Sequence, residues 1–111
     1  MSGTDLLGEF EQLVLLAILR QGDAAYALPV RRSIEEATER SVSRGALYRT
    51  LDRMGTKGLV AWTLEQASEE RGGNPRKRFS VTGAGLEALQ RSRAVVGRMS
   101  AGLEELLEQP S

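Results

Sequence analysis

The side chains of this sequence that are best suited to chemistry are arginines and lysines, and they gather in two short segments. The span 40–57 holds five of them beside a single acid, Asp52, and the span 71–78 holds four with no acid. Each span has a net charge of +4, the remainder has −8, and the formal charge of the 111-residue chain is zero. Guanidinium forks match phosphate oxygens and the O6/N7 edge of guanine. The two spans therefore favour a nucleic-acid partner.

The composition lacks most of the side chains that enzymes use for catalysis. The sequence contains no His and no Cys, which excludes imidazole bases, thiol nucleophiles, disulfides and the usual zinc sites. The acidic pairs fall on helix faces expected to be solvated or in a polar loop, and no phosphate-cradling loop accompanies them. These pairs are Glu35–Glu36, Glu69–Glu70 and Glu104–Glu105. We expect no enzyme, no catalytic residue, no metal site and no cofactor.

Three helices are expected to position the first basic span. Apolar spacing predicts helices over residues 8–21, 28–38 and 44–57. Pro29 is tolerable because it falls in the first turn of the second helix, and Ser43 is a suitable N-cap for the third. The third helix should bury one apolar stripe and turn a mainly cationic face outward. The stripe is Leu47, Leu51 and Met54, and the outward face is Gly45, Arg49, Asp52, Arg53 and Thr56, flanked by Arg44 and Tyr48.

A β-hairpin is expected to carry the second basic span. Residues 59–66 and 78–82 alternate apolar and polar side chains, which predicts two strands. The polar segment 68–75 would form the loop, with Gly-Gly-Asn-Pro at 72–75 as its tip. Trp62 occupies an alternating strand position, so we expect it to pack in the core rather than to stack on a ligand.

A long helix from Thr82 to about Glu108 is expected to follow the hairpin. Apolar residues recur along it at 3- and 4-residue spacing, as the a and d positions of a heptad do. The first helix is apolar nearly all round, which is more than a small chain readily buries by itself. The stripe could instead pack on the chain's own core, but a partner copy explains both features better. The expected dimer interface comprises Leu15, Leu16, Leu19, Leu89, Val96, Met99, Leu103 and Leu106.

The order of these elements, with cations on the third helix and at the hairpin, is that of a winged helix-turn-helix. We predict a mainly α fold with a small β-hairpin and a C-terminal dimerisation helix. Residues 1–82 would form the DNA-binding region and residues 83–108 the dimerisation helix, within one compact domain. The longest apolar run, 13–19, is too short to span a membrane. The first ten residues lack the basic start of a signal peptide, so we expect a cytoplasmic protein.

Two motifs resemble those of the PadR-like transcriptional regulators. The segments Ser-Arg-Gly-Ala-Leu-Tyr-Arg-Thr-Leu at 43–51 and Gly-Gly-Asn-Pro-Arg-Lys at 72–77 are together fairly specific, and the likeness is widest over residues 8–82. The single C-terminal helix is similar to that of the compact subgroup. The resemblance implies a homodimeric DNA-binding regulator, usually a repressor, with its third helix in the major groove. Some relatives sense aromatic or drug-like compounds at the dimer interface, so we expect a small-molecule effector.

The resemblance also implies which residues meet double-stranded DNA. On matching positions these are Ser43, Arg44, Gly45, Tyr48 and Arg49 of the third helix and Arg76 and Lys77 of the wing. To these the cationic helix face adds Arg53, and the loop tip adds Gly73 and Asn74. We expect sequence-specific binding of an inverted repeat by a homodimeric repressor that an effector releases. The alternative is a winged-helix protein-interaction module without direct DNA readout.

Overall fold

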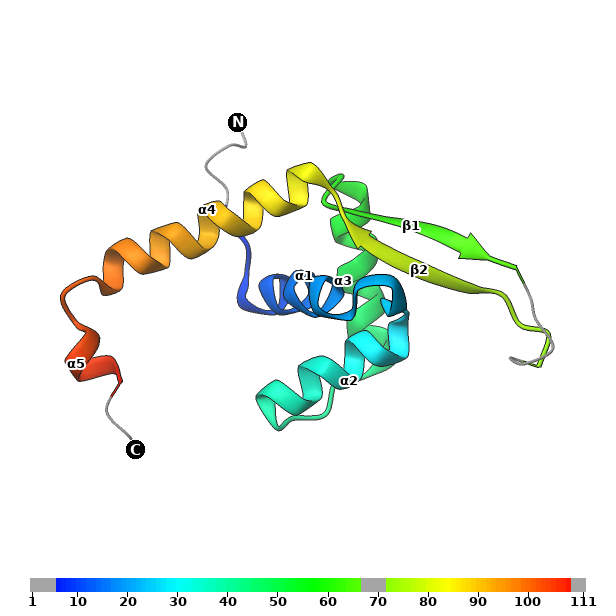
Figure 1. The fold of residues 1–111 in the computed structure, drawn as a ribbon, viewed down its shortest axis with the longest axis horizontal. Helices are drawn as coiled ribbons and strands as arrows, with labels where there is room; N and C mark the ends of the chain where they lie inside the picture. The colour runs from blue at the N-terminus through cyan, green and yellow to red at the C-terminus, as the bar shows by residue number, and fades with distance from the viewer. Residues whose placement is uncertain (1–5, 67–71, 109–111) are drawn as a thin grey trace.

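The structure is a computed structural model that describes residues 6–66 and 72–108 (Figure 1). It is mostly helical with one two-stranded antiparallel hairpin, as predicted. Among the described residues, no helix is both long enough and apolar enough to cross a membrane. The elements in chain order are α1 Glu9–Gln21, the 3-10 turn η2 Gly22–Ala24, α2 Ala27–Thr38, α3 Arg44–Thr56, β1 Val60–Glu65, β2 Arg76–Val81, α4 Gly83–Ser100 and α5 Glu104–Leu107.

The predicted bounds of the first three helices are confirmed to within one or two residues, because local signals set them. Ser43 caps α3 by accepting a hydrogen bond of 3.0 Å from the backbone N–H of Ala46. Pro29 lies in the first turn of α2, where its missing N–H leaves no intrahelical bond unmade. Gly22 follows α1 with φ +55° and Gly58 follows α3 with φ +78°, a region that glycine adopts readily.

The core is formed by the inner faces of α1, α2 and α3, the base of the hairpin and the start of α4. Its buried apolar members include Val14, Leu15, Ile18, Val30, Ile34, Leu47, Leu51, Met54, Val60, Phe79 and Leu89. The expectation that α1 has too much apolar surface for one chain is therefore largely wrong. The hairpin and α4 pack on α1 in addition to α2 and α3, and Leu19 is left exposed near the end of α1.

The hairpin is longer than predicted on its second strand, which begins at Arg76 rather than at Arg78. In its register Val60 lies opposite Val81, and Glu65 opposite Arg76. Hydrogen bonds join the hairpin to the segment that leads into α2: the N–H of Phe79 donates to the carbonyl of Ala25 at 2.9 Å, and the hydroxyl of Tyr26 donates to Oε1 of Glu65 at 2.8 Å. Half of the predicted loop 68–75, residues 68–71, lies outside the described residues.

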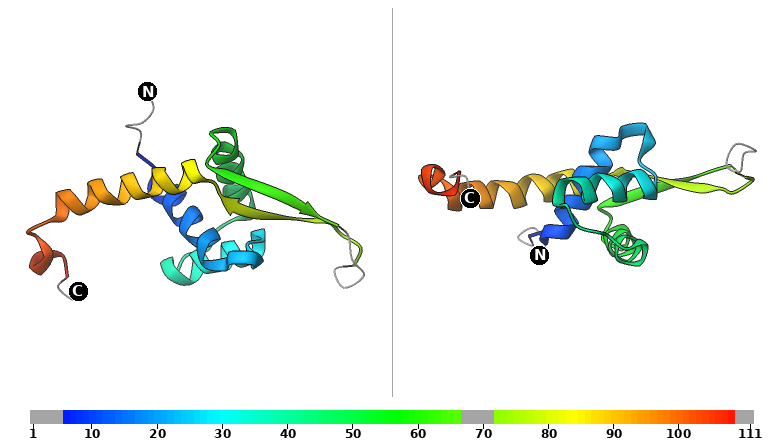
Figure 2. Two further views of the ribbon diagram at one scale, coloured as in Figure 1. Left: turned by 45° about the horizontal axis from the view of Figure 1, so that its top comes forward. Right: turned by 90° about the horizontal axis from the view of Figure 1, so that it is seen from below.

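Trp62 corrects one prediction, because half of its side chain is exposed, at 50%. Val60 and Phe79, nearer the base of the hairpin, are buried. The alternation of β1 correctly puts Val60 and Trp62 on one face, but the hairpin projects beyond the helices, as both views in Figure 2 show. The core therefore ends before it covers the indole.

The C-terminal segment corrects another prediction, because it is two helices rather than one. Helix α4 ends at Ser100, and α5 begins at Glu104. Between them Gly102 has φ +87°, and its N–H donates to the carboxylate of Glu104 at 3.0 Å. A glycine in this conformation ends a helix, so the heptad spacing from Leu89 to Leu103 does not run along a single axis. The α4–α5 arm and the hairpin leave the body in opposite directions (Figure 1).

Candidate nucleic-acid interface

Helix α3 turns the predicted face outward. Arg44, Gly45, Arg49 and Asp52 are exposed, whereas Leu51 on the opposite side is buried. A Cβ atom at Gly45 would lie 3.2 Å from Nη1 of Arg49, so the glycine leaves room for that guanidinium to lie along the helix. This face therefore presents two guanidiniums and a low backbone surface between them, which is a shape that can enter a groove.

Tyr48 joins the outward face of α3 to the hairpin. The Cζ atom of Arg44 lies 5.4 Å from the centre of the Tyr48 ring, a cation–π contact. The same ring meets Phe79 of β2 edge-on, with 6.5 Å between the ring centres. Tyr48 is thus held between a buried aromatic residue and an exposed cation, so its position follows the packing of the hairpin on α3.

Arg53 is directed away from the outward face of α3. Its Nε lies 3.3 Å from Oε2 of Glu11 on α1, and its Nη2 lies 3.5 Å from Oγ1 of Thr50. Lys57 adds a second cation, 3.8 Å from the same Glu11 oxygen. We expected Arg53 to be one of the cations that face DNA. In the structure its guanidinium instead pairs with Glu11 of the same chain.

Glu11 on α1 is the acid that pairs with these two cations, and the sequence analysis did not identify it as a site residue. Burial raises the pKa of Glu11, but the N–H of Gly8, the Arg53 guanidinium and the charge of Lys57 outweigh burial and hold this pKa below its ordinary value of 4.5. The carboxylate is therefore charged at neutral pH and fixes α3 to α1. The one sequence signal for this role is the position of Glu11, an acid within a largely apolar helix.

The hairpin cations differ in how far they are neutralised. Arg78 forms ion pairs with Glu65 at 3.1 Å and with Asp23 at 3.6 Å. Arg76 stacks on Tyr26, with its Cζ 3.5 Å from the ring centre, and lies 3.7 Å from Glu65. Because these acids lie beside Arg76 and Arg78, the net charge around the two arginines is lower than the count over residues 71–78 suggested.

Lys77 differs from these arginines, because it forms no ion pair with any residue that the structure describes. Its Nζ lies 4.2 Å from the centre of the Trp62 ring. Gly73 and Asn74 are exposed near the hairpin tip, and Gly73 has φ +83°. Arg71, a member of the second basic span, lies outside the described residues.

A groove of about 1060 Å³ separates the hairpin from the first turns of α2 and α3. We call it the basic groove, because the charged side chains that line it, within the described ranges 6–66 and 72–108, are all cations: Arg31, Arg44, Arg76 and Lys77. Its remaining lining includes the rings of Tyr26 and Tyr48. The structure thus brings together residues of both basic spans, whereas Arg53 and Arg78 form ion pairs with acids of the same chain.

The residues expected at a dimer interface fall into two groups. Leu15 and Leu89 are buried in the core of the chain, so they have no surface to offer a partner, and Leu16 is partly buried. Leu19 and Leu103 are exposed, as are Val96 at 61%, Met99 at 76% and Leu106 at 71%. The exposed group lies mainly on the α4–α5 arm.

A three-helix body with a hairpin beside its third helix defines a winged helix-turn-helix protein. The family model of the PadR-like transcriptional regulators matches residues 15–91, and the chain belongs to this family. Its members are regulators of transcription and not enzymes, in agreement with the expectation from composition.

Solved structures agree with this assignment. A PadR-like transcriptional regulator from Bacillus cereus is 27% identical, with a TM-score of 0.69 over 91% of this chain and 93% of that chain. A PadR-like transcription factor from Bacteroides fragilis is 25% identical, with a TM-score of 0.71 over 87% and 88% of the two chains. RosR from H. salinarum, at 20% identity, shares the fold with a TM-score of 0.67 over 91% and 90%. No curated protein sequence matches the chain.

Proposed function

We propose that this protein regulates transcription by binding specific double-stranded DNA sequences as a homodimer. The observation that carries the proposal is the basic groove. Among the residues that the structure describes, four cations and no acid line this hollow beside the exposed face of α3. A groove lined by one sign of charge attracts an anionic backbone. A phosphate strand seated there would leave α3 beside the base edges of the adjoining major groove.

The predicted site residues take distinct roles in this arrangement. Arg49, on the outward face of α3, reads a base edge, and Arg44 at the start of the helix reads a base or a phosphate. Ser43 and Gly45 allow a close approach of the helix N-terminus. Tyr48, Arg76 and Lys77 meet the strand in the basic groove. Gly73 and Asn74 reach the adjoining groove from the hairpin tip.

The α4–α5 arm is the proposed dimerisation surface. Its exposed apolar side chains, Val96, Met99 and Leu106, are best covered by a second copy of the chain. This divides the chain into a DNA-binding region up to Thr82 and a dimerisation arm from Gly83. A two-fold dimer calls for an inverted-repeat operator with half-sites about 10 bp apart, or a multiple of that spacing.

We further propose that the protein acts as a cytoplasmic repressor whose binding to DNA an effector relieves. The support is its family, together with the placement of its DNA-reading surface and its arm on one short chain. In such an arrangement, a change in how two arms meet alters the spacing of two α3 helices and thereby their fit to the operator.

Selection of genomic fragments by the full chain, followed by sequencing, tests this proposal. We expect the bound fragments to share one inverted repeat. Fragments without a common sequence would contradict sequence-specific binding, and a common sequence without two-fold symmetry would contradict the homodimer.

A further inference from the structure

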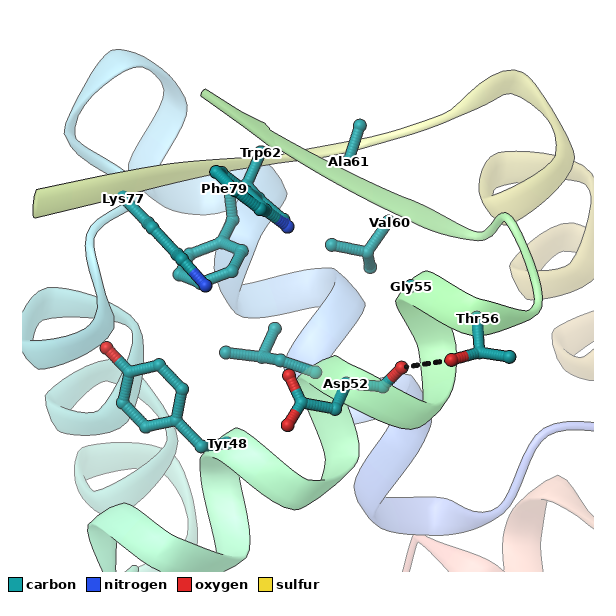
Figure 3. A pocket seen from close by; sticks show the side chains of 10 residues that line it. Tyr48, Asp52, Gly55, Thr56, Val60, Ala61, Trp62, Lys77 and Phe79 are labelled. Atoms are coloured by element: carbon teal, nitrogen blue, oxygen red, sulfur yellow. Dashed lines mark hydrogen bonds between the residues drawn. The ribbon is translucent and has the colours of Figure 1, made fainter. Parts of the chain in front are cut away.

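A second hollow, of about 420 Å³, lies between the C-terminal half of α3 and the base of the hairpin (Figure 3). Three aromatic rings line it, those of Tyr48, Trp62 and Phe79. We call it the aromatic pocket. Its volume falls within the range of about 300–1,000 Å³ that is usual for small-molecule sites. Trp62 is half-exposed at its edge. The Nζ of Lys77 lies 4.2 Å from the centre of its ring, so a planar ligand that stacks on the indole must displace this ammonium toward the edge of the ligand.

Two charged groups of opposite sign enter the aromatic pocket. Asp52 reaches into it from α3 and Lys77 from β2 (Figure 3). Within the described part of the chain neither forms an ion pair; the contact of Asp52 is made by its backbone carbonyl, which accepts from Thr56 at 3.0 Å. A phosphate would be repelled by Asp52, and a cation by Lys77. The pocket therefore suits a neutral planar molecule that donates hydrogen bonds to the carboxylate and accepts one from the ammonium.

We propose that the aromatic pocket binds the guanine ring. Guanine carries two adjacent N–H donors, on N1 and N2, which match the two oxygens of one carboxylate, and the neighbouring O6 is an acceptor for an ammonium. Its bicyclic ring stacks on aromatic side chains. Adenine fails the match, because its N1 is an acceptor that would face the Asp52 carboxylate.

The aromatic pocket adjoins the basic groove, and Tyr48 and Lys77 line both. Guanine bound to Lys77 therefore engages a cation that the groove would otherwise present to a phosphate. The binding of guanine itself needs only the pocket, so it stands apart from the proposed binding of DNA and is tested without DNA.

Fluorescence of Trp62, the one tryptophan of the chain, gives a direct test on the full-length protein without DNA. We expect guanosine to change the emission saturably. Inosine, which lacks the N2 donors, should bind about tenfold more weakly, because a hydrogen bond to a charged group contributes about that factor. Adenosine should bind more weakly still. Equal affinity for adenosine and guanosine would overturn the proposal.

Substitutions of the two charged pocket residues test whether they recognise guanine. Asp52→Asn replaces an acceptor with an amide that cannot serve both donors, and we expect at least about a tenfold loss of guanosine affinity. Lys77→Gln should weaken binding as well. The exposed acid Glu36 on α2 offers a matched control, and Glu36→Gln should leave the affinity unchanged. Thermal unfolding of each variant verifies folding. An unchanged affinity in folded Asp52→Asn would contradict the proposal.

A short single strand of thymidines with one central guanine distinguishes a free nucleoside from a base carried on a nucleic acid. Calorimetric titration of guanosine and of this strand, with an adenine-bearing strand as control, gives the two affinities. Binding of either guanine probe that Asp52→Asn abolishes supports recognition of the ring and shows which source presents it. Failure of both probes overturns the proposal and leaves the proposed regulation of transcription untouched.

Discussion

Glu11 on α1 and Arg53 on α3 are 42 residues apart in the sequence and are joined by an ion pair of 3.3 Å. The carboxylate is nearly buried, whereas half of the arginine side chain is exposed. Glu11 also accepts from the N–H of Gly8 at 2.8 Å. This cluster fixes the orientation of α3, the helix that we propose reads DNA, on α1 in the core.

Replacement of Glu11 by Gln should lower the free energy of unfolding by about 1–2 kcal/mol at neutral pH, because a charged acceptor of two hydrogen bonds is lost and one partner is solvent-exposed. Urea unfolding measures the change. Glu9→Gln alters an exposed acid on the same helix and should cost less. A loss no larger than that of Glu9→Gln would contradict a structural role for Glu11.

The same carboxylate predicts a dependence of stability on pH. Because the pKa of Glu11 is lowered on folding, its contribution is present above the ordinary value of 4.5 and is lost as the pH falls through the lower pKa of the folded state. The difference in unfolding free energy between the wild type and Glu11→Gln should therefore shrink in acid. A difference that stays constant through this range would be inconsistent with the ion pair.

Gly85 and Gly83 form a matched pair of glycines at the start of α4. A Cβ atom at Gly85 would collide with the carbonyl oxygen of Leu59 and would lie 3.0 Å from Cγ1 of Val81. Gly85→Ala should lower the free energy of unfolding by about 1–3 kcal/mol or more, because the clash is with the backbone of Leu59 rather than with the end of a flexible side chain. Gly83→Ala meets nothing within 4 Å and should be neutral or stabilising by up to about 1 kcal/mol. Thermal unfolding distinguishes them, and a reversed order would show that α4 packs differently.

The two basic side chains Arg49 and Lys77 should contribute differently to DNA binding. If Arg49 reads a base, Arg49→Ala should reduce discrimination between the operator and altered sites by about 1–3 kcal/mol. Lys77→Ala should weaken binding to all sequences about equally and reduce the salt slope by about 1. Arg93 on α4 is an exposed cation away from both hollows, and Arg93→Ala provides the control. Fluorescence anisotropy measures all three, and unchanged binding in the first two variants would refute the surface assignment.

The double variant Val96→Glu and Leu103→Glu should convert a dimer into a monomer. Both side chains are exposed in the single chain, so the substitutions do not disturb its core. Light scattering after size-exclusion chromatography gives the mass. Leu86, an exposed residue nearer the start of α4, supplies the control Leu86→Glu. A double variant that remains dimeric would exclude the arm as the interface.

Local signals in the sequence were sufficient for the helices, their caps and the alternation of the strands. The cap at Ser43 depends only on residues within one turn, and the outward face of α3 follows from its period. The exposure of Trp62 could not be predicted in the same way, because it depends on how far the hairpin extends past the helices. The break at Gly102 depends on a single backbone conformation that a heptad pattern does not reveal.

The sequence was sufficient to predict which basic segments form the candidate site. It was not sufficient to predict which of their cations form ion pairs. The two basic spans do meet at the basic groove. However, Glu11 and Arg53 are distant in the sequence, as are Asp23 and Arg78, and both contacts depend on tertiary structure. A count of charges along the chain therefore overestimated how many cations are available to a phosphate backbone.

The salt dependence of operator binding by the full chain tests whether this protein binds specific DNA sequences. A dimer that neutralises about 6–10 phosphates should give a slope of about −5 to −9 for the logarithm of the binding constant against the logarithm of the salt concentration. It should also bind the selected operator more tightly than a scrambled duplex of the same length at every salt concentration. A slope near zero, or equal affinity for the two duplexes, would contradict sequence-specific DNA binding by this protein.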